Sequence, residues 1–312
     1  MNPSKLLFFG EYAVLFGSDC LAIPYKAFYG ELTVEQPDAE SEKRAIWSNR
    51  QLMAFNAYLQ KQQELLRLTS AFDTELLSAD IARGLWYRST IPGQSGLGSS
   101  GALVASLIER YLPNLPHESI DAELKNSFAL MESFFHGNSS GIDPLVSYVQ
   151  RPVAIVSKQI HFPDISAKFP DELKLFLVRT NEPRNTKALV EQFTNLLEDS
   201  DFKQDFQNEV LAATNDIIKS MLDENADHEE WVLKLKNVSQ LQLKFFATII
   251  PKTIAAAMQY GLDTGLFTLK LLGSGGGFMI GFTYNLKETI VKLNEIGLSY
   301  ERQIKISDLE LS

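Results

Sequence analysis

Hydrophobic positions along the chain follow two different periods. Short apolar or alternating runs, which are typical of strands, occur at 6–9, 13–16, 29–35, 85–90, 153–156, 173–179, 267–272, 278–283 and 300–306. Apolar residues recur every three or four positions, as in helices, at 102–108, 120–135 and 286–296 and over most of 186–260. Because strands and helices mix without regular alternation, we predict an α+β fold.

The length of 312 residues allows one large domain or two modest ones. We place a domain boundary within 162–170, and we predict an N-terminal domain over 1–165 and a C-terminal domain over 166–312. A chain of this length buries enough apolar surface to need no disulfide or metal to hold it together.

The chain carries 29 basic and 39 acidic residues, a formal net charge of −10. This excess of acid argues against bulk nucleic-acid binding and against docking on anionic membranes, although a site can still be positive locally. Because Cys20 is the single cysteine, we expect neither an intrachain disulfide nor a cysteine-based zinc site. This cysteine usage suits a protein of the reducing cytoplasm. The apolar stretches at 245–258 and 267–282 are interrupted, so no membrane-spanning segment is expected.

A glycine-rich loop between a predicted strand and a predicted helix carries the most informative chemistry. Its glycines remove Cβ atoms that would keep a ligand from the backbone. A phosphate at the start of the helix gains unpaired N–H donors and the positive end of the helix dipole. The alternative is an ordinary turn with a serine cap, and the spacing matches neither a Walker A loop nor a Rossmann fingerprint. The loop comprises Pro92, Gly93, Gln94, Ser95, Gly96, Leu97, Gly98, Ser99 and Ser100.

Two further segments carry candidate chemistry. Four of the five residues at 273–277 are glycine, which indicates either close approach of a ligand or a flexible hairpin. Glu132 borders the apolar stripe of a predicted helix, and Asp143 follows a small polar turn. Two carboxylates near such a turn can hold magnesium and accept a hydroxyl proton. The alternative is a helix end capped by Gly137, followed by a turn at Pro144.

Together these segments resemble the motifs of the GHMP kinases, the superfamily of galactokinase, homoserine kinase, mevalonate kinase and phosphomevalonate kinase. The stretch K-L-L-F-F-G-E-Y-A-V at 5–14 is similar to the first motif, 92–100 to the second, and L-L-G-S-G-G-G at 271–277 to the third. The motifs stand in the family's order, and their span covers nearly the whole chain. Within the superfamily, H-G-N-S-S-G-I-D at 136–143 and P-R-N-T at 183–186 resemble segments of the mevalonate kinases.

The resemblance implies an N-terminal domain like the second domain of ribosomal protein S5 and a ferredoxin-like C-terminal domain, with ATP and substrate between them. It implies a cytoplasmic enzyme of isoprenoid precursor synthesis that uses ATP and Mg²⁺ to phosphorylate the 5-hydroxyl of mevalonate. Family members are often homodimers.

The resemblance also assigns roles by position. Lys5 matches the lysine placed near the reacting hydroxyl, and Asp143 matches the carboxylate usually assigned as catalytic base, which either abstracts the proton or orients the alcohol. Ser100 and Glu132 match the Mg²⁺ ligands, and the loop at 92–100 matches the ATP-binding loop. The residues matched to the substrate region are Glu11, Tyr12, Arg184, Thr186, Gly275 and Gly276.

The chain departs from the mevalonate kinase pattern at several motif positions. Tyr12 stands where histidine is usual, Gly101 where alanine is usual, and Phe278 where many relatives have a small residue. Phosphomevalonate kinase is therefore the main alternative activity, and other GHMP kinases are weaker ones. A GHMP-fold protein that binds nucleotide or a partner without catalysis is a further alternative, although such a protein need not keep the lysine and both carboxylates together.

Overall fold

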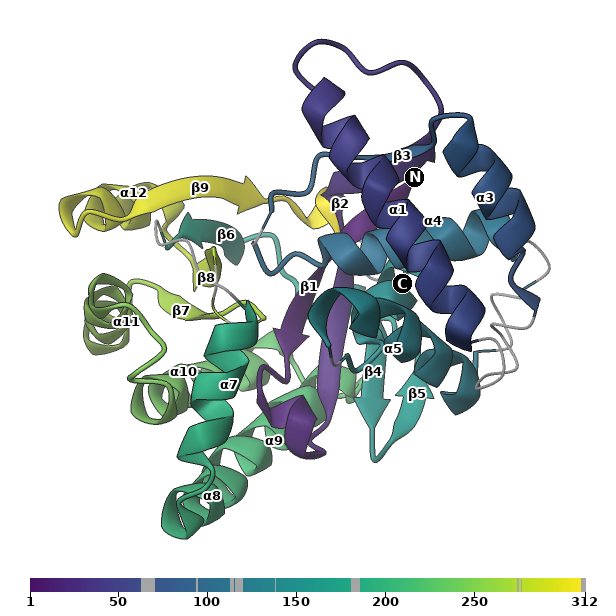
Figure 1. Ribbon diagram of the computed structural model, residues 1–312. Coiled ribbons are helices and arrows are strands. Elements are labelled where there is room, and N and C mark those ends of the chain that lie inside the picture. The colour runs from purple at the N-terminus through teal and green to yellow at the C-terminus, as the bar shows by residue number, and fades with distance from the viewer. Residues whose placement is uncertain are drawn as a thin grey trace. The chain divides into compact units, whose positions relative to one another are not determined.

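The computed structural model describes most of the chain, namely residues 1–62, 71–93, 95–112, 115, 120–137, 139–180, 186–273, 275 and 277–309. Within these residues the fold is α+β and contains two antiparallel sheets, which confirms the predicted fold class (Figure 1). No helix in these ranges is long and apolar enough to cross a membrane.

The chain divides into two compact units whose sequence segments interleave. The first unit comprises Met1–Lys5, Pro24–Gly93 and Gly98–Arg151. The second unit comprises Leu6–Ile23, Gln94–Leu97 and Pro152–Ser312. The chain therefore passes from one unit to the other several times. The division into domains 1–165 and 166–312 remains a prediction about which segments fold independently.

One sheet has the strand order β1-β2-β4-β5, with β3 paired to β2. In the first unit, residues 30–33 of β2 pair antiparallel with β3, and in the second unit, residues 20–22 of β2 pair antiparallel with β4. All eight residues of β1 are buried, so the lysine on this strand is withdrawn from water. The strands are β1 (Asn2–Phe9), β2 (Cys20–Thr33), β3 (Trp86–Ser89), β4 (Val153–Val156) and β5 (Gln159–His161).

Five described helices build the first unit. The helices α4, α5 and α6 pack against one another, and α1 packs on α3, α5 and β3. Because residues 101–108 are all small or apolar, α4 is buried on every side along this stretch. Aspartates cap α3 and α5 by accepting bonds from backbone N–H groups. The helices are α1 (Glu42–Gln62), α3 (Thr74–Ala82), α4 (Ser99–Tyr111), α5 (Ala122–His136) and α6 (Ile142–Val149).

The second unit contains a sheet of four antiparallel strands in the order β7-β8-β6-β9. The helices α10 and α11 contact β7, and α12 contacts β9 (Figure 1). A one-turn π-helix at Gln207–Leu211 joins α8 to α9. The strands are β6 (Lys174–Arg179), β7 (Thr268–Leu271), β8 (Phe278–Thr283) and β9 (Ser299–Ile304). The helices are α7 (Thr186–Leu196), α8 (Ser200–Phe206), α9 (Ala212–Leu222), α10 (His228–Phe245), α11 (Lys252–Thr264) and α12 (Leu286–Glu295).

Aromatic side chains dominate the core of the second unit. The ring of Phe193 packs against those of Phe206 and Phe246, with centroids about 5 Å apart in tilted or edge-on contact. Phe8 of β1 contacts the rings of Trp231 and Phe282 in the same manner. Fourteen of the twenty phenylalanines of the chain are buried in the core.

The structure corrects several predicted elements. Ala13–Phe16, predicted as a strand, is a single turn of 3-10 helix, because the backbone turns sharply at Gly10 and Tyr12, where φ is +115° and +58°. The helices α1 and α3 were not predicted, and exposed apolar side chains such as Trp47 and Met53 blur the helical period of α1. Pro144, which the alternative interpretation placed in a turn, lies in the first turn of α6, where proline's fixed φ suits a helix.

Candidate active site

A buried lysine and a partly exposed aspartate form an ion pair in the first unit. Lys5 lies on β1 and is 3% exposed, and its Nζ lies 3.0 Å from Oδ1 of Asp143. Asp143 lies in the first turn of α6, where the helix dipole favours a negative charge. The aspartate keeps 28% of its side chain exposed. The structure thus brings together the two residues matched to catalysis, although they lie far apart in the sequence.

Two helices begin beside this ion pair because glycines allow their backbones to approach. Gly98 precedes α4 with φ of +75°, and an added Cβ there would lie 2.8 Å from Cγ of Lys5 and 3.4 Å from Oδ2 of Asp143. An added Cβ on Gly101 would lie 2.6 Å from the carbonyl carbon of Asp143. The first turns of α4 and α6 therefore meet at the ion pair, and their N-terminal ends make the local potential more positive.

A second carboxylate is buried next to this arrangement. Glu132, on α5, is 4% exposed and accepts hydrogen bonds from the hydroxyl groups of Ser100, at 2.9 Å, and Ser139, at 2.5 Å. Burial, and then the neighbouring charge of Asp143, raise the pKa of Glu132 to about 7, against the opposing effect of the two hydroxyls and of Lys5. Such a carboxylate is costly to ionise without a further positive charge beside it.

This donor set fits a magnesium ion bound to phosphate. Glu132 and Ser100 offer the oxygen ligands that Mg²⁺ prefers, and a cation there would offset the cost of ionising Glu132. Within the described ranges, no three His, Cys, Asp or Glu side chains are grouped to hold a metal ion by themselves. Mg²⁺ usually completes its coordination with substrate phosphates and water, so a sparse protein donor set is what such a site requires.

The glycine-rich loop leads into α4 through Gly98, which is the N-cap of this helix. Gly98 has no side chain, so the helix start is not capped by a serine at the N-cap position. Earlier in the loop, the N–H of Leu97 donates to the Ser95 hydroxyl at 3.3 Å. Pro92 and Gly93 open the loop, and an added Cβ on Gly93 would meet no atom within 4 Å. The open helix start suits a phosphate ligand.

A residue of the first motif meets the lysine that precedes the third motif, within the second unit. Glu11 forms an ion pair with Lys270 of β7, and both side chains are almost wholly buried. Tyr12 is 4% exposed and packs its ring against those of Phe193 and Phe246. Neither residue of the first motif is open to solvent in this structure.

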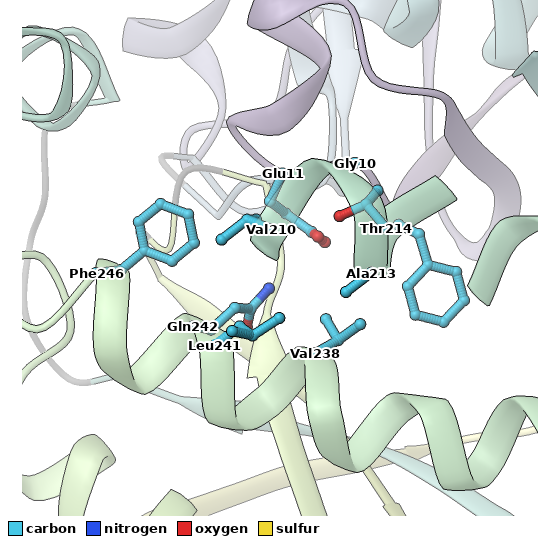
Figure 2. A pocket seen from close by; sticks show the side chains of 10 residues that line it. Gly10, Glu11, Val210, Ala213, Thr214, Val238, Leu241, Gln242 and Phe246 are labelled. Atoms are coloured by element: carbon cyan, nitrogen blue, oxygen red, sulfur yellow. The ribbon is translucent and has the colours of Figure 1, made fainter. Parts of the chain in front are cut away.

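A small cavity of ≈ 10 Å³ lies in the second unit, next to the first motif (Figure 2). Figure 2 shows the side chains of Glu11 and Gln242 reaching into it. This volume holds about one water molecule and is far too small for a nucleotide or a sugar-sized substrate. The lining residues are Phe9, Gly10, Glu11, Val210, Ala213, Thr214, Val238, Leu241, Gln242 and Phe246.

The third motif approaches the second within the same unit. The segment 273–277 lies between β7 and β8, which pair antiparallel. An added Cβ on Gly273 would lie 3.5 Å from the carbonyl oxygen of Gly96. Gly275 has φ of +76°, a conformation that favours glycine. Two glycine segments that are far apart in the sequence therefore lie side by side.

Some residues of the predicted site lie outside the described part of the chain. These are Gln94 of the ATP loop, Gly276 of the third motif and Arg184 of the P-R-N-T segment. Thr186 begins α7, and its side chain is also outside the described residues. Their assignment to nucleotide and substrate stays a prediction.

The structure adds three residues to the candidate site. Ser139 donates to Glu132, Gly101 permits the close approach of α4 and α6, and Lys270 pairs with Glu11. Ser139 lies within the segment that resembles the mevalonate kinases, and Gly101 directly follows the ATP loop. The positions of both residues in or beside a motif could therefore have indicated them. Lys270 carried only the weak signal of a lysine inside an apolar strand.

Comparison with known proteins relates the chain to kinases of small alcohols. No family model matches it. Its sequence is 25% identical over 290 residues to the mevalonate kinase of Pyrococcus abyssi, a match that covers 88% of this chain and 85% of that protein. The mevalonate kinase of Methanococcus jannaschii has a similar fold, with a TM-score of 0.64, 18% identity, and coverage of 97% and 96% of the two chains. The Streptococcus pneumoniae phosphomevalonate kinase, solved with phosphomevalonate and AMPPNP, gives 0.59 at 16% identity, covering 97% and 98%.

The α+β fold with two antiparallel sheets matches solved structures of GHMP kinases. The curated proteins that the sequence resembles, at about 25% identity, are mevalonate kinases. This homology indicates an ATP-dependent phosphotransferase.

Proposed function

We propose that the chain is a mevalonate kinase, which transfers the γ-phosphoryl group of ATP to the 5-hydroxyl of mevalonate in a Mg²⁺-dependent reaction. The observation that carries this proposal is the Lys5–Asp143 ion pair, at 3.0 Å, beside the first turns of α4 and α6. Phosphoryl transfer needs in-line positioning and neutralisation of charge more than covalent catalysis, and this arrangement supplies both. The similarity to mevalonate kinases supports the choice of alcohol.

Asp143 accepts the proton of the alcohol in the proposed reaction. The hydroxyl oxygen forms a bond to the γ-phosphorus, the bond from that phosphorus to the β,γ-bridging oxygen breaks, and ADP is released. The proton passes to the exposed carboxylate of Asp143, which then returns it to solvent. Lys5 is held on a buried strand, so it keeps the carboxylate oriented and adds positive charge near the transferred group.

Glu132 and Ser100 are the residues that would hold Mg²⁺, with the α4 start binding the phosphates. The bound ion would neutralise charge on the phosphate oxygens. Ser139 orients the Glu132 carboxylate through its hydrogen bond, and Gly98 leaves the helix start open to the nucleotide. All of these residues lie in the first unit.

An ADP-release assay with four alcohols tests this proposal. Mevalonate, phosphomevalonate, galactose and homoserine are each supplied with ATP and Mg²⁺, and we expect mevalonate to give the highest kcat/KM. A preference for phosphomevalonate would refute the substrate and leave the kinase class intact. Tight binding of ATP and Mg²⁺ without turnover of any alcohol would instead favour a non-catalytic nucleotide-binding protein.

A further inference from the structure

Lys270 is a fully buried cation on β7, directly before the glycine segment 273–277. Its side chain is 0% exposed, and that of its partner Glu11 is 2% exposed. The ring of Phe9 lies beneath the ammonium group, 5.6 Å from its nitrogen. Bulk solvent therefore has almost no access to this ion pair.

The same lysine is bonded to the strand that leads into the glycine segment. Its Nζ donates to the carbonyl oxygen of Leu271 at 2.7 Å. The N–H of Leu271 donates at 2.7 Å to Oε1 of Gln242, whose side chain reaches the small cavity beside Glu11 (Figure 2). Both backbone groups of Leu271 are therefore held by buried polar side chains, two residues before Gly273.

The segment held in this way lies against the ATP loop. An added Cβ on Gly273 would lie 3.5 Å from the carbonyl oxygen of Gly96, which places the two residues in van der Waals contact range. A shift of β7 along its own direction would therefore move the glycine segment relative to Gly96. The contacts run from Glu11 through Lys270 and Leu271 to Gly273.

A buried ion pair is weak evidence for stability, because removing two charges from water costs about as much as their attraction returns. The local backbone is also strained: Tyr12, next to Glu11, has φ of +58°, which is unfavourable for a bulky residue. Strain of this kind persists where the surrounding structure enforces it, most often near functional sites. The buried ion pair and the strained backbone at Tyr12 are therefore better explained by a role in setting local geometry than by a role in stability.

We propose that Lys270 is a positioning residue for nucleotide binding. Paired with Glu11, it sets Gly273, where the third glycine segment begins, against Gly96 of the ATP loop. The lysine is fully buried, so it acts through Glu11 and Leu271 and does not touch the nucleotide itself. This inference rests on the proposed kinase function only in assuming that the ATP loop binds nucleotide.

The double variant Glu11→Gln/Lys270→Met tests the proposal, because it removes both charges and nearly conserves volume. Replacing a buried pair with neutral groups usually preserves folding, whereas removing one partner leaves an unpaired buried charge. We expect a folded protein whose Kd for ADP, measured by calorimetry, rises about tenfold. A wild-type Kd in the folded double variant would overturn the proposal.

The matched control is the exposed pair Glu209 and Lys244 in the same unit. The variant Glu209→Gln/Lys244→Met loses the same charges at the surface, and its Kd for ADP should equal that of the wild type. A tenfold weaker Kd in this control would also overturn the proposal, because loss of any ion pair would then have the same effect.

A conservative variant keeps the test decisive if the double variant does not fold. Glu11→Asp retains both charges but withdraws the carboxylate by one methylene group, and we expect a several-fold rise in the Kd for ADP. An unchanged Kd would contradict the positioning role. Because the readout is nucleotide affinity, a wild-type protein that binds ADP but does not phosphorylate mevalonate refutes the proposed substrate and leaves this inference open to the same measurement.

Discussion

Lys5 and Asp143 have unequal exposure, and the inequality suits their proposed roles. The lysine keeps 4% of its side chain exposed and the aspartate keeps 28%. A proton acceptor must be reached by the alcohol, whereas a cation that orients it is more effective in surroundings with little water.

Replacing Asp143 with asparagine tests the proton-accepting role. The amide keeps the size of the side chain but cannot accept the proton, so we expect kcat to fall by about 10²–10⁴-fold. The Kd for ADP should change little. Asp121→Asn is the control: Asp121 caps α5, and asparagine caps equally well, so kcat should be unchanged. Near-normal turnover in Asp143→Asn would remove Asp143 from this role.

Glu132 makes the stability of the ligand-free protein depend on pH. Burial raises its pKa from 4.5 to about 7, so between these values the folded state holds a proton that the unfolded state releases. The contribution of Glu132 to the free energy of unfolding is therefore greatest below pH 4.5 and declines as the pH rises to 7, by about 3 kcal/mol.

Urea unfolding of wild type and Glu132→Gln at pH 5 and pH 8, without metal or nucleotide, measures this decline. The variant should lose less stability than the wild type over this interval, since its side chain does not titrate. Glu123→Gln removes an exposed carboxylate from the same helix and should behave as the wild type does. Parallel pH profiles for Glu132→Gln and wild type would contradict the assignment.

At the scale of elements, the candidate site depends on how closely α4 approaches β1 and α6. α4 carries small and apolar residues on every side at 101–108, so it is buried against its neighbours along this stretch. Gly98 and Gly101 then bring its first turn to the Lys5–Asp143 pair. Glycine at these two positions is therefore a packing requirement as well as a feature of the motif.

Gly98→Ala tests this approach. The residue has φ of +75°, and the new Cβ would lie 2.8 Å from Cγ of Lys5, so the lysine must move. We expect kcat to fall at least about tenfold, together with a loss of about 1–2 kcal/mol in the free energy of unfolding from the left-handed backbone.

Gly84→Ala separates the two effects. Gly84 has φ of +92°, but an added Cβ there meets no atom within 4 Å. This variant should lose a similar amount of stability and keep the wild-type kcat. If Gly98→Ala shows only the loss of stability seen in Gly84→Ala, the contact with Lys5 is unimportant for turnover.

For the whole molecule, the net charge of −10 and an anionic substrate are compatible. Two helix starts and one buried lysine concentrate positive potential at one place, although the surface as a whole is acidic. The net negative charge of the protein repels a nucleotide at long range and slows its approach. It does not cancel the short-range attraction of the N–H groups at the helix starts.

Nucleotide binding should stabilise the folded chain measurably. A ligand that binds only the folded state at 100 times its Kd adds about 2.7 kcal/mol to the free energy of unfolding. We expect a non-hydrolysable ATP analogue with Mg²⁺ to raise Tm in thermal unfolding, and adenosine, which lacks phosphates, to raise it much less. Equal shifts with both ligands would contradict a phosphate site at the start of α4.

Much of the site could be predicted because its chemistry is local in the sequence. The glycine loop at 92–100 joins a strand to a helix, so neighbours along the chain are enough to predict a phosphate site there. The fold class followed from the two hydrophobic periods, which arise directly from strand and helix geometry. In contrast, α1 was not predicted, because its exposed apolar residues obscure the helical period of its buried face.

Residue types and their spacing alone determined the fold class, the glycine loops and a set of candidate carboxylates. Only the tertiary structure decided that Lys5 meets Asp143, that Ser139 and Ser100 both bond to Glu132, and that Lys270 meets Glu11. These contacts join residues from different elements, so no local period or turn preference encodes them. The raised pKa of Glu132 likewise depends on burial, which is a property of the packed molecule and not of the side chain.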